Sequence, residues 1–133
     1  YLDGIAFDAP TATFFEELKQ ATGRSGYHQG GPILALGDLC GAVIAMGGYI
    51  PETFWYFSDD NAISPEHSRN FSCMHLKNLR IDEHGRLPLV FINSGINQQV
   101  IDCLADSEVP FPEGYNLEQT ITCHLFWYYY RLY

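Results

Sequence analysis

Residues 32–46 read PILALGDLCGAVIAM and include the longest apolar stretch of the chain. Pro32 is typical of the first turn of a helix, and the apolar residues after it fall on nearly every side of a helix. The apolar part, residues 33–46, has 14 residues and contains Asp38, so it is shorter than the roughly 20 residues that cross a bilayer. Residues 32–46 therefore predict a helix at the centre of a globular core.

The sequence before this stretch predicts a helix followed by a glycine-rich loop. The capping-box pattern TFFE predicts a helix that begins at Thr13, and apolar residues then recur at helical spacing as far as Gly23. Residues 23–31 contain four glycines in nine positions and predict a flexible loop. The loop enters the predicted core helix at its amino end, where backbone N–H groups can bind an anion. Because the loop lacks a phosphate-binding pattern, a plain connection is the simpler interpretation.

The sequence after the predicted core helix favours strands. Residues 53–57 form an aromatic run before a polar turn, which predicts a short strand. Residues 70–81 and 87–93 are two β-prone runs joined by a glycine-containing turn, which predicts a hairpin. Apolar residues share one helical face over residues 97–106, and residues 117–127 alternate between apolar and polar types. The last two segments therefore predict a third helix and a long final strand.

These elements predict an α+β fold in the order α-α-β-β-β-α-β. The sequence favours a mostly antiparallel sheet of about four strands with two to three helices packed on one face. The 133 residues, 47% of them hydrophobic, are enough for one core, so residues 1–133 are interpreted as a single globular domain.

The net charge of −9 narrows the range of partners. The seven basic residues are scattered, whereas nucleic-acid binding depends on clustered lysines and arginines. Anionic membrane surfaces would repel the chain for the same reason. We therefore expect no nucleic acid and no membrane among its partners, and we expect small molecules or basic proteins instead.

The cysteines are widely separated and lie in apolar surroundings, at Cys40, Cys73, Cys103 and Cys123. They lack the dense spacing of a disulfide framework and the tight knuckles of a zinc site. Four buried free thiols are the simplest interpretation, which predicts a reducing, cytoplasmic location and neither a metal nor a cofactor. Two disulfides stay open as an alternative, because sequence cannot rank the three pairings. The chain begins at Tyr1 and not at Met, so we expect a trimmed amino terminus.

Aromatic and acidic residues support the leading functional hypothesis. Exposed tyrosine and tryptophan rings suit a recognition surface, and acidic loops are complementary to a basic partner and speed association with it. The hypothesis is a protein-binding inhibitor, such as an immunity protein or a phage-encoded antagonist, that blocks a basic protein. Its predicted binding residues are Trp55, Tyr56, Asp59, Asp60, Tyr128 and Tyr130.

A pocket is the alternative hypothesis, in a small-molecule-binding protein or a small enzyme. Cys73 and His75 bring a thiol and a base to the same face of the predicted strand, and Asp38 is the one charge in the predicted core helix. Together with His28 in the glycine-rich loop, these residues would line the pocket. No complete catalytic motif accompanies them, so we assign no catalytic residue and expect binding more than catalysis. A third interpretation is a homodimer through the C-terminal strand, which would be an unpaired sheet edge.

Overall fold

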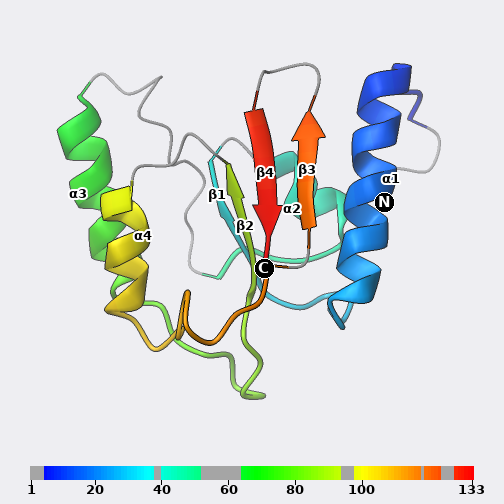
Figure 1. Cartoon of the computed structure of the whole chain (residues 1–133). Helices are drawn as coiled ribbons and strands as arrows, with labels where there is room; N and C mark the ends of the chain where they lie inside the picture. The colour runs from blue at the N-terminus through cyan, green and yellow to red at the C-terminus, as the bar shows by residue number, and fades with distance from the viewer. Residues whose placement is uncertain (1–4, 38–39, 52–63, 94–97, 118, 124–127) are drawn as a thin grey trace.

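The computed structural model describes residues 5–37, 40–51, 64–93, 98–117, 119–123 and 128–133. Over these residues the elements follow one another as α1 (Ala9–Arg24), β1 (Ile33–Leu36), α2 (Cys40–Ala45), α3 (Pro65–Leu76), β2 (Leu89–Asn93), α4 (Gln98–Ala105), β3 (Gln119–Cys123) and β4 (Tyr128–Leu132) (Figure 1). The predicted α+β class is confirmed, but the predicted order of elements is wrong.

The four strands form one mixed sheet in the order β1-β2-β4-β3. β1 and β2 are parallel, with Ile33 opposite Leu89, and the connection between them contains α2 and α3. β4 is antiparallel to β2 on one side and to β3 on the other. The sheet is therefore less antiparallel than predicted, because a parallel pair is made possible by a long crossover connection.

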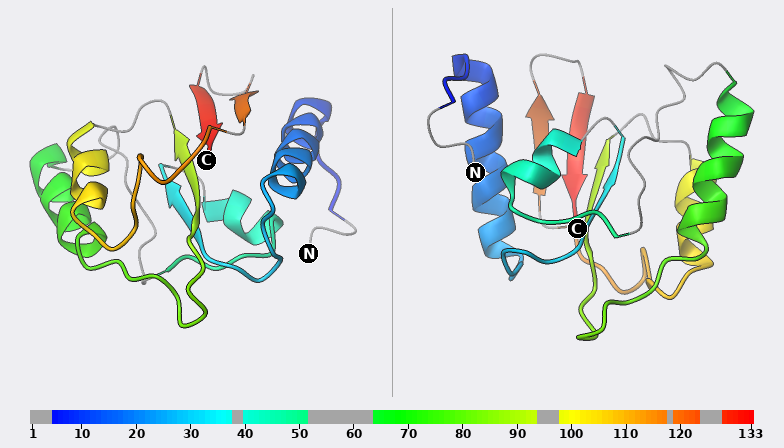
Figure 2. Two further views of the ribbon diagram at one scale, coloured as in Figure 1. Left: turned by 60° about the horizontal axis from the view of Figure 1, so that its bottom comes forward. Right: turned by 180° about the vertical axis from the view of Figure 1, so that it is seen from behind.

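Helices cover both faces of the sheet, and not one face as predicted (Figure 2). On one face Leu18 of α1 and Val43 of α2 are buried in the same cluster as Phe91 of β2. On the other face Leu76 of α3 and Leu104 of α4 share a second cluster, to which β1 and β2 contribute their alternate residues. Because every residue of β1 and β2 is buried, both strands are nearly continuous apolar runs, as is typical of strands covered on both faces.

The predicted helix over residues 32–46 is wrong, because its first part is the strand β1 and only its last part is the helix α2. A short apolar run fits a fully buried strand as well as a buried helix, and periodicity alone does not separate the two. Gly37 follows β1 with a φ of 116°, a conformation that L side chains rarely adopt. A Cβ at Gly37 would lie 2.6 Å from the Cβ of Asn93, so β1 and β2 approach closely here because this residue is glycine.

The predicted strand over residues 70–81 is also wrong, and with it the predicted hairpin. Residues 65–76 form α3, which begins with Pro65 in its first turn and with the Ser64 side chain accepting a hydrogen bond from the His67 backbone N–H. Ser72 and Leu76, four residues apart, are buried on one side of the helix. The apolar residues of the segment switch between odd-numbered and even-numbered positions, so they do not fit one face of a strand. The three-to-four-residue spacing of a helix accounts for this pattern. The second run of the predicted hairpin is a strand, β2.

The remaining elements agree with the sequence to different degrees. α1 begins at Ala9 and not at Thr13, because the Asp8 carboxylate accepts a hydrogen bond from the Thr11 backbone N–H at 3.1 Å and caps the helix. α4 lies within residues 97–106 and confirms the predicted third helix. The predicted long final strand over residues 117–127 contains β3, and β4 begins beyond it at Tyr128. The predicted strand over residues 53–57 lies outside the described residues.

Candidate functional site

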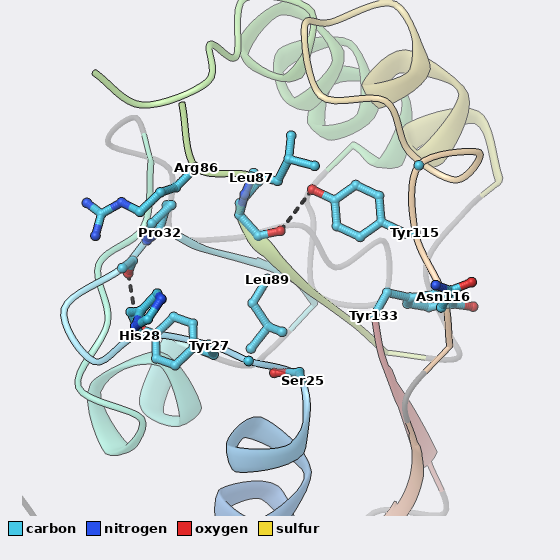
Figure 3. Close-up of a pocket in the computed structure, with 14 residues that line it drawn as sticks. Ser25, Tyr27, His28, Pro32, Arg86, Leu87, Leu89, Tyr115, Asn116 and Tyr133 are labelled. Carbon is cyan, nitrogen blue, oxygen red and sulfur yellow. Dashed lines mark hydrogen bonds between the residues drawn. The ribbon is translucent and has the colours of Figure 1, made fainter. Parts of the chain in front are cut away.

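A cavity of about 360 Å³ lies at the end of the sheet where β1 and β2 begin and β4 ends (Figure 3). Residues 25–28 and 31 of the glycine-rich loop form one wall with Pro32, and residues 86–89 and 114–116 form others together with Tyr133. We call this cavity the tyrosine pocket, after Tyr27, Tyr115 and Tyr133. Its volume lies at the small end of the roughly 300 to 1,000 Å³ that ligand sites occupy.

Two of the tyrosines are held by hydrogen bonds to the walls of the pocket. The hydroxyl of Tyr115 donates to the carbonyl oxygen of Pro88 at 2.9 Å, and that of Tyr27 donates to the carbonyl oxygen of Gly31 at 3.1 Å. The hydroxyl protons are thus already in use, and the rings are fixed. Burial raises the pKa of Tyr115. Burial also raises the pKa of Tyr27, more than the bond to Gly31 and the charge of Arg86 lower it. Both side chains are therefore neutral at physiological pH and offer aromatic surface to a ligand.

The glycine-rich loop is folded against the segment that follows α2. Gly31 donates to the carbonyl oxygen of His28 at 2.9 Å, and the backbone N–H of Tyr49 donates to the carbonyl oxygen of Gly31 at 3.1 Å. A Cβ at Gly31 would lie 2.9 Å from the carbonyl oxygen of His28 and 3.1 Å from Cε2 of Tyr27. Glycine at position 31 therefore lets the loop close around the Tyr27 ring.

Arg86 brings a positive charge to the pocket. Its Nε donates to the Asp82 carboxylate at 2.6 Å, and that carboxylate also accepts from the backbone N–H groups of Arg86 and His84. The Asp82 side chain is only 9% exposed and holds the guanidinium in place. Among the described residues, the two terminal nitrogens of Arg86 have no hydrogen-bond partner. They remain available as donors to an anion.

The Asp82 carboxyl group is itself shifted by these contacts. Burial raises its pKa. The backbone and side-chain hydrogen bonds from Arg86, the bond from His84 and the charge of Arg86 together lower the pKa by more than burial raises it. The net result is a pKa below the ordinary value of 3.8, so Asp82 stays ionised and keeps Arg86 oriented through the physiological range.

Of the four residues predicted to line a pocket, the structure places only His28 in the tyrosine pocket. Cys73 and His75 lie on α3, which covers the opposite part of the sheet from the glycine-rich loop (Figure 1). Cys73 forms a disulfide with Cys103 of α4, and the ring of His75 lies 4.5 Å from that of Phe71. Asp38 lies outside the described residues. The structure therefore places Cys73 and His75 away from the pocket that His28 lines, and the predicted position of Asp38 stays a prediction.

The disulfide also corrects the expectation of four free thiols. Cys73 and Cys103, with Cα atoms 5.2 Å apart, are joined, and the side chains of Cys40 and Cys123 lie outside the described part of the chain. The cytoplasmic location, which depended on free thiols, stays a prediction.

The residues predicted to bind a basic protein lie mostly outside the description. Trp55, Tyr56, Asp59 and Asp60 are not among the described residues, and Tyr128 and Tyr130 are described only as backbone positions of β4. β4 pairs with β2 and with β3, so the C-terminal strand is not an unpaired edge. Within the described sheet the outer strands are β1 and β3, and a homodimer through a sheet edge would have to use one of them.

Sequence patterns did not identify the other residues of the pocket. Arg86 follows a glycine-containing turn, and Tyr27 precedes His28 in the glycine-rich loop, which are weak local signals. Tyr115 and Tyr133 belong to segments far away in the sequence, and only the folded sheet brings them beside the loop.

Comparison with models of protein families, with curated proteins and with solved structures finds no match. Within the described residues, no group of three or more His, Cys, Asp or Glu side chains could hold a metal ion. None of the helices in that part of the chain is long and apolar enough to cross a membrane. The geometry of the tyrosine pocket therefore carries the functional argument.

Proposed function

We propose that the chain binds a small organic anion with a flat aromatic body in the tyrosine pocket. The observation that carries this proposal is the Arg86 side chain, which is fixed by Asp82 and lines the same cavity as three tyrosines. A carboxylate that accepts from a guanidinium forms a charge-assisted hydrogen bond, and a flat ring packs on tyrosine faces.

The charge distribution supports an anionic ligand. The chain has 16 acidic residues and a net charge of −9, yet none of the described residues that line the tyrosine pocket is acidic. Arg86 and His28 both line it. The Asp82 carboxylate lies 2.6 Å from the Nε of Arg86 but does not line the pocket, and it is engaged by Arg86 and by two backbone N–H groups. An anion in the pocket therefore meets donors and no lining carboxylate, although the surface as a whole repels it.

The apolar walls support a flat organic body. Leu87, Leu89 and Pro32 line the pocket together with the tyrosine rings. Leu87 is 42% exposed, and a ligand that covers it would remove apolar surface from water. A few convergent polar groups in a largely apolar pocket are typical of small-molecule sites.

Benzoate and its neutral counterpart benzamide test the proposal, with binding followed by amide chemical shifts in NMR spectra. We expect benzoate to shift the amide signals of residues 25–31, 86, 87, 89 and 114–116 and to bind more tightly than benzamide. Arg86→Gln should lower the benzoate affinity by about tenfold or more, because a hydrogen bond to a charged group contributes about 1.5 to 3 kcal/mol.

His28→Ala should weaken benzoate binding without loss of folding, because the side chain is exposed.

Arg80→Gln is the matched control, since Arg80 pairs with Glu108 and does not line the pocket. It makes the same change in net charge and should leave benzoate affinity unchanged. Equal affinity of the wild-type protein for benzoate and benzamide would contradict the proposal. Equal losses of benzoate affinity in Arg80→Gln and Arg86→Gln would contradict it as well. Arg86→Lys keeps the positive charge and loses the planar guanidinium. It therefore separates the contribution of the charge to benzoate affinity from that of the guanidinium geometry.

The acidic surface favours a second candidate, the inhibitor of a basic protein. Basic side chains that already have partners within the chain include Arg24 with Gln119, Lys77 with Asp106, Arg80 with Glu108 and Arg86 with Asp82. The acidic excess thus remains available to a basic partner.

A pull-down at low and raised salt tests the inhibitor proposal. Capture of one basic protein in a fixed ratio, weakened by salt, is expected. Binding should be lost when Tyr128→Ala is combined with Tyr130→Ala while the melting temperature is kept. Retained binding in that double variant would remove the predicted tyrosines from the interface.

A further inference from the structure

A second cavity, of about 570 Å³, lies between α1 and α2 on the face of the sheet that these helices cover. Phe15 and Leu18 of α1, Met46 after α2 and Phe7 before α1 give it apolar walls. Its two charged side chains, Glu16 and Lys19, are opposite in sign. Thr22 and Gln29 also line the cavity, so its walls are apolar in part and carry no net charge. It therefore suits an alkyl chain better than an anionic group.

Tyr27 borders this second cavity and also the tyrosine pocket. Its hydroxyl donates to the carbonyl oxygen of Gly31. A Cβ at Gly48 would lie 2.5 Å from the Tyr27 hydroxyl oxygen, and a Cβ at Gly31 would lie 3.1 Å from the ring. Two glycines and one hydrogen bond therefore hold the ring closely in one position, as a wall between the two cavities.

We infer that Tyr27 determines the length of the ligand by separating the tyrosine pocket from a second, partly apolar cavity that would otherwise accept an alkyl tail. This inference rests on the proposed function, because the ligand's charged and aromatic parts are taken to lie in the tyrosine pocket. In the wild-type protein the Tyr27 ring ends the site, so compact aromatic anions are accepted and their long-chain derivatives gain nothing.

Benzoates with an alkyl chain in the para position test the inference directly. Benzoate, 4-butylbenzoate and 4-hexylbenzoate are titrated into the wild-type protein and into Tyr27→Ala by calorimetry. We expect wild-type affinity to stay level or fall as the chain grows. In Tyr27→Ala the affinity should rise by up to about fourfold for each methylene group that enters the second cavity. In NMR spectra, 4-hexylbenzoate should shift the amide signals of Phe15 and Met46 in the variant and not in the wild-type protein.

Tyr27→Leu is the second variant, because it removes the ring and keeps more of the apolar packing if Tyr27→Ala does not fold. Tyr49→Ala is the matched control: Tyr49 is 44% exposed, lies next to the same loop and borders neither cavity. It should keep the wild-type response to chain length.

The possible results separate this inference from the proposed function. If the wild-type protein already binds the alkylbenzoates more tightly as their alkyl chain grows, Tyr27 does not limit the length of the ligand and the inference is overturned. If benzoate binds but neither Tyr27 variant gains affinity with chain length, the inference is overturned and the proposed function stands. If benzoate does not bind the wild type and 4-hexylbenzoate binds only the variants, the separating wall is supported and the proposed function fails. Binding to none of the proteins overturns both.

Discussion

Gly48 shows how a single missing side chain positions the tyrosine pocket. A Cβ at this position would lie 2.5 Å from the Tyr27 hydroxyl oxygen and 2.7 Å from Cγ1 of Ile33. We therefore expect Gly48→Ala to lower the free energy of unfolding by about 1 to 3 kcal/mol, the usual cost of an overpacked site. Urea unfolding measures this change.

Gly23→Ala is the control with the opposite expected sign. Gly23 lies in the last turn of α1, and a Cβ there would have no atom within 4 Å. Replacing an unhindered helical glycine by alanine should stabilise the protein by up to about 1 kcal/mol. If both substitutions change stability in the same direction, the close packing of Gly48 against Tyr27 is not supported.

Asp82 makes the stability of the protein depend on acid pH. Its pKa is lower in the folded chain than the ordinary value of 3.8, so the unfolded chain takes up the proton first as the pH falls. The stabilisation is therefore fully present above about pH 3.8 and is lost as the pH falls through the lower, folded pKa.

Asp82→Asn should consequently be less stable than wild type at pH 6, and the gap should narrow below about pH 3.8. Urea unfolding at pH 6, 4 and 3 provides the measurement. Glu113→Gln, which changes an exposed carboxylate, should stay within about 0.5 kcal/mol of wild type at each pH. A gap between Asp82→Asn and wild type that does not depend on pH would show that the carboxylate acts through packing alone.

At the residue scale the sequence predicted little of the candidate site. His28 was predicted because it stands in a glycine-rich loop, which is a local signal. Arg86, Tyr115 and Tyr133 become neighbours only through the pairing of β2 with β1 and with β4, and such pairings join residues far apart in the sequence. Asp82, which orients Arg86, was predicted only as part of a turn.

At the scale of elements, whether a helix or strand was predicted correctly depended on what surrounds the segment. α4 was predicted correctly because its apolar residues lie on one helical face, and Val100, Cys103 and Leu104 are the buried ones. β1 was mistaken for a helix because burial on both faces removes the alternation that identifies a strand. α3 was mistaken for a strand because residues 70–81 are β-prone, whereas the structure shows that the helix begins at a Ser-Pro start signal, residues 64 and 65.

The disulfide between α3 and α4 leads to a prediction at the scale of elements. It joins residues separated by 30 positions, so it limits the freedom of the unfolded chain. Reduction of the wild-type protein should lower the free energy of unfolding by about 2 to 4 kcal/mol. The measurement is the urea transition with and without reductant.

The double variant Cys73→Ser with Cys103→Ser should have the stability of the reduced protein and should not respond to reductant. Alkylation of denatured, unreduced protein should leave Cys73 and Cys103 unmodified, as read by peptide mass spectrometry. Modification of both cysteines without reductant would mean that the bond does not form.

At the scale of the whole molecule, the central strands tie the two helical layers together. Phe91 of β2 belongs to the cluster under α1 and α2, while its neighbours Val90 and Ile92 belong to the cluster under α3 and α4. A loss of packing in one layer therefore weakens strands that the other layer also needs.

We expect one cooperative unfolding transition that responds to a change in either layer. Leu18→Ala in α1 and Leu104→Ala in α4 remove fully buried side chains, and each should cost about 2 to 5 kcal/mol. Hydrogen exchange should show that either variant lowers protection in both α1 and α4. Met74→Ala, at a side chain 54% exposed, should change stability by less than about 0.5 kcal/mol. Loss of protection confined to the mutated layer would mean that the layers unfold separately.

The position of β4 between β2 and β3 has a consequence for synthesis on the ribosome. β4 is the last of the four strands to be translated, and within the described sheet it is the strand through which β3 is attached. Until Tyr128–Leu132 have emerged, the nascent chain can pair β1 with β2 but must leave one edge of β2 open. An open, apolar edge invites association with other chains, so this is the stage at which a chaperone would matter most. A translation product that stops before Tyr128 thus loses two strands from the sheet and not one.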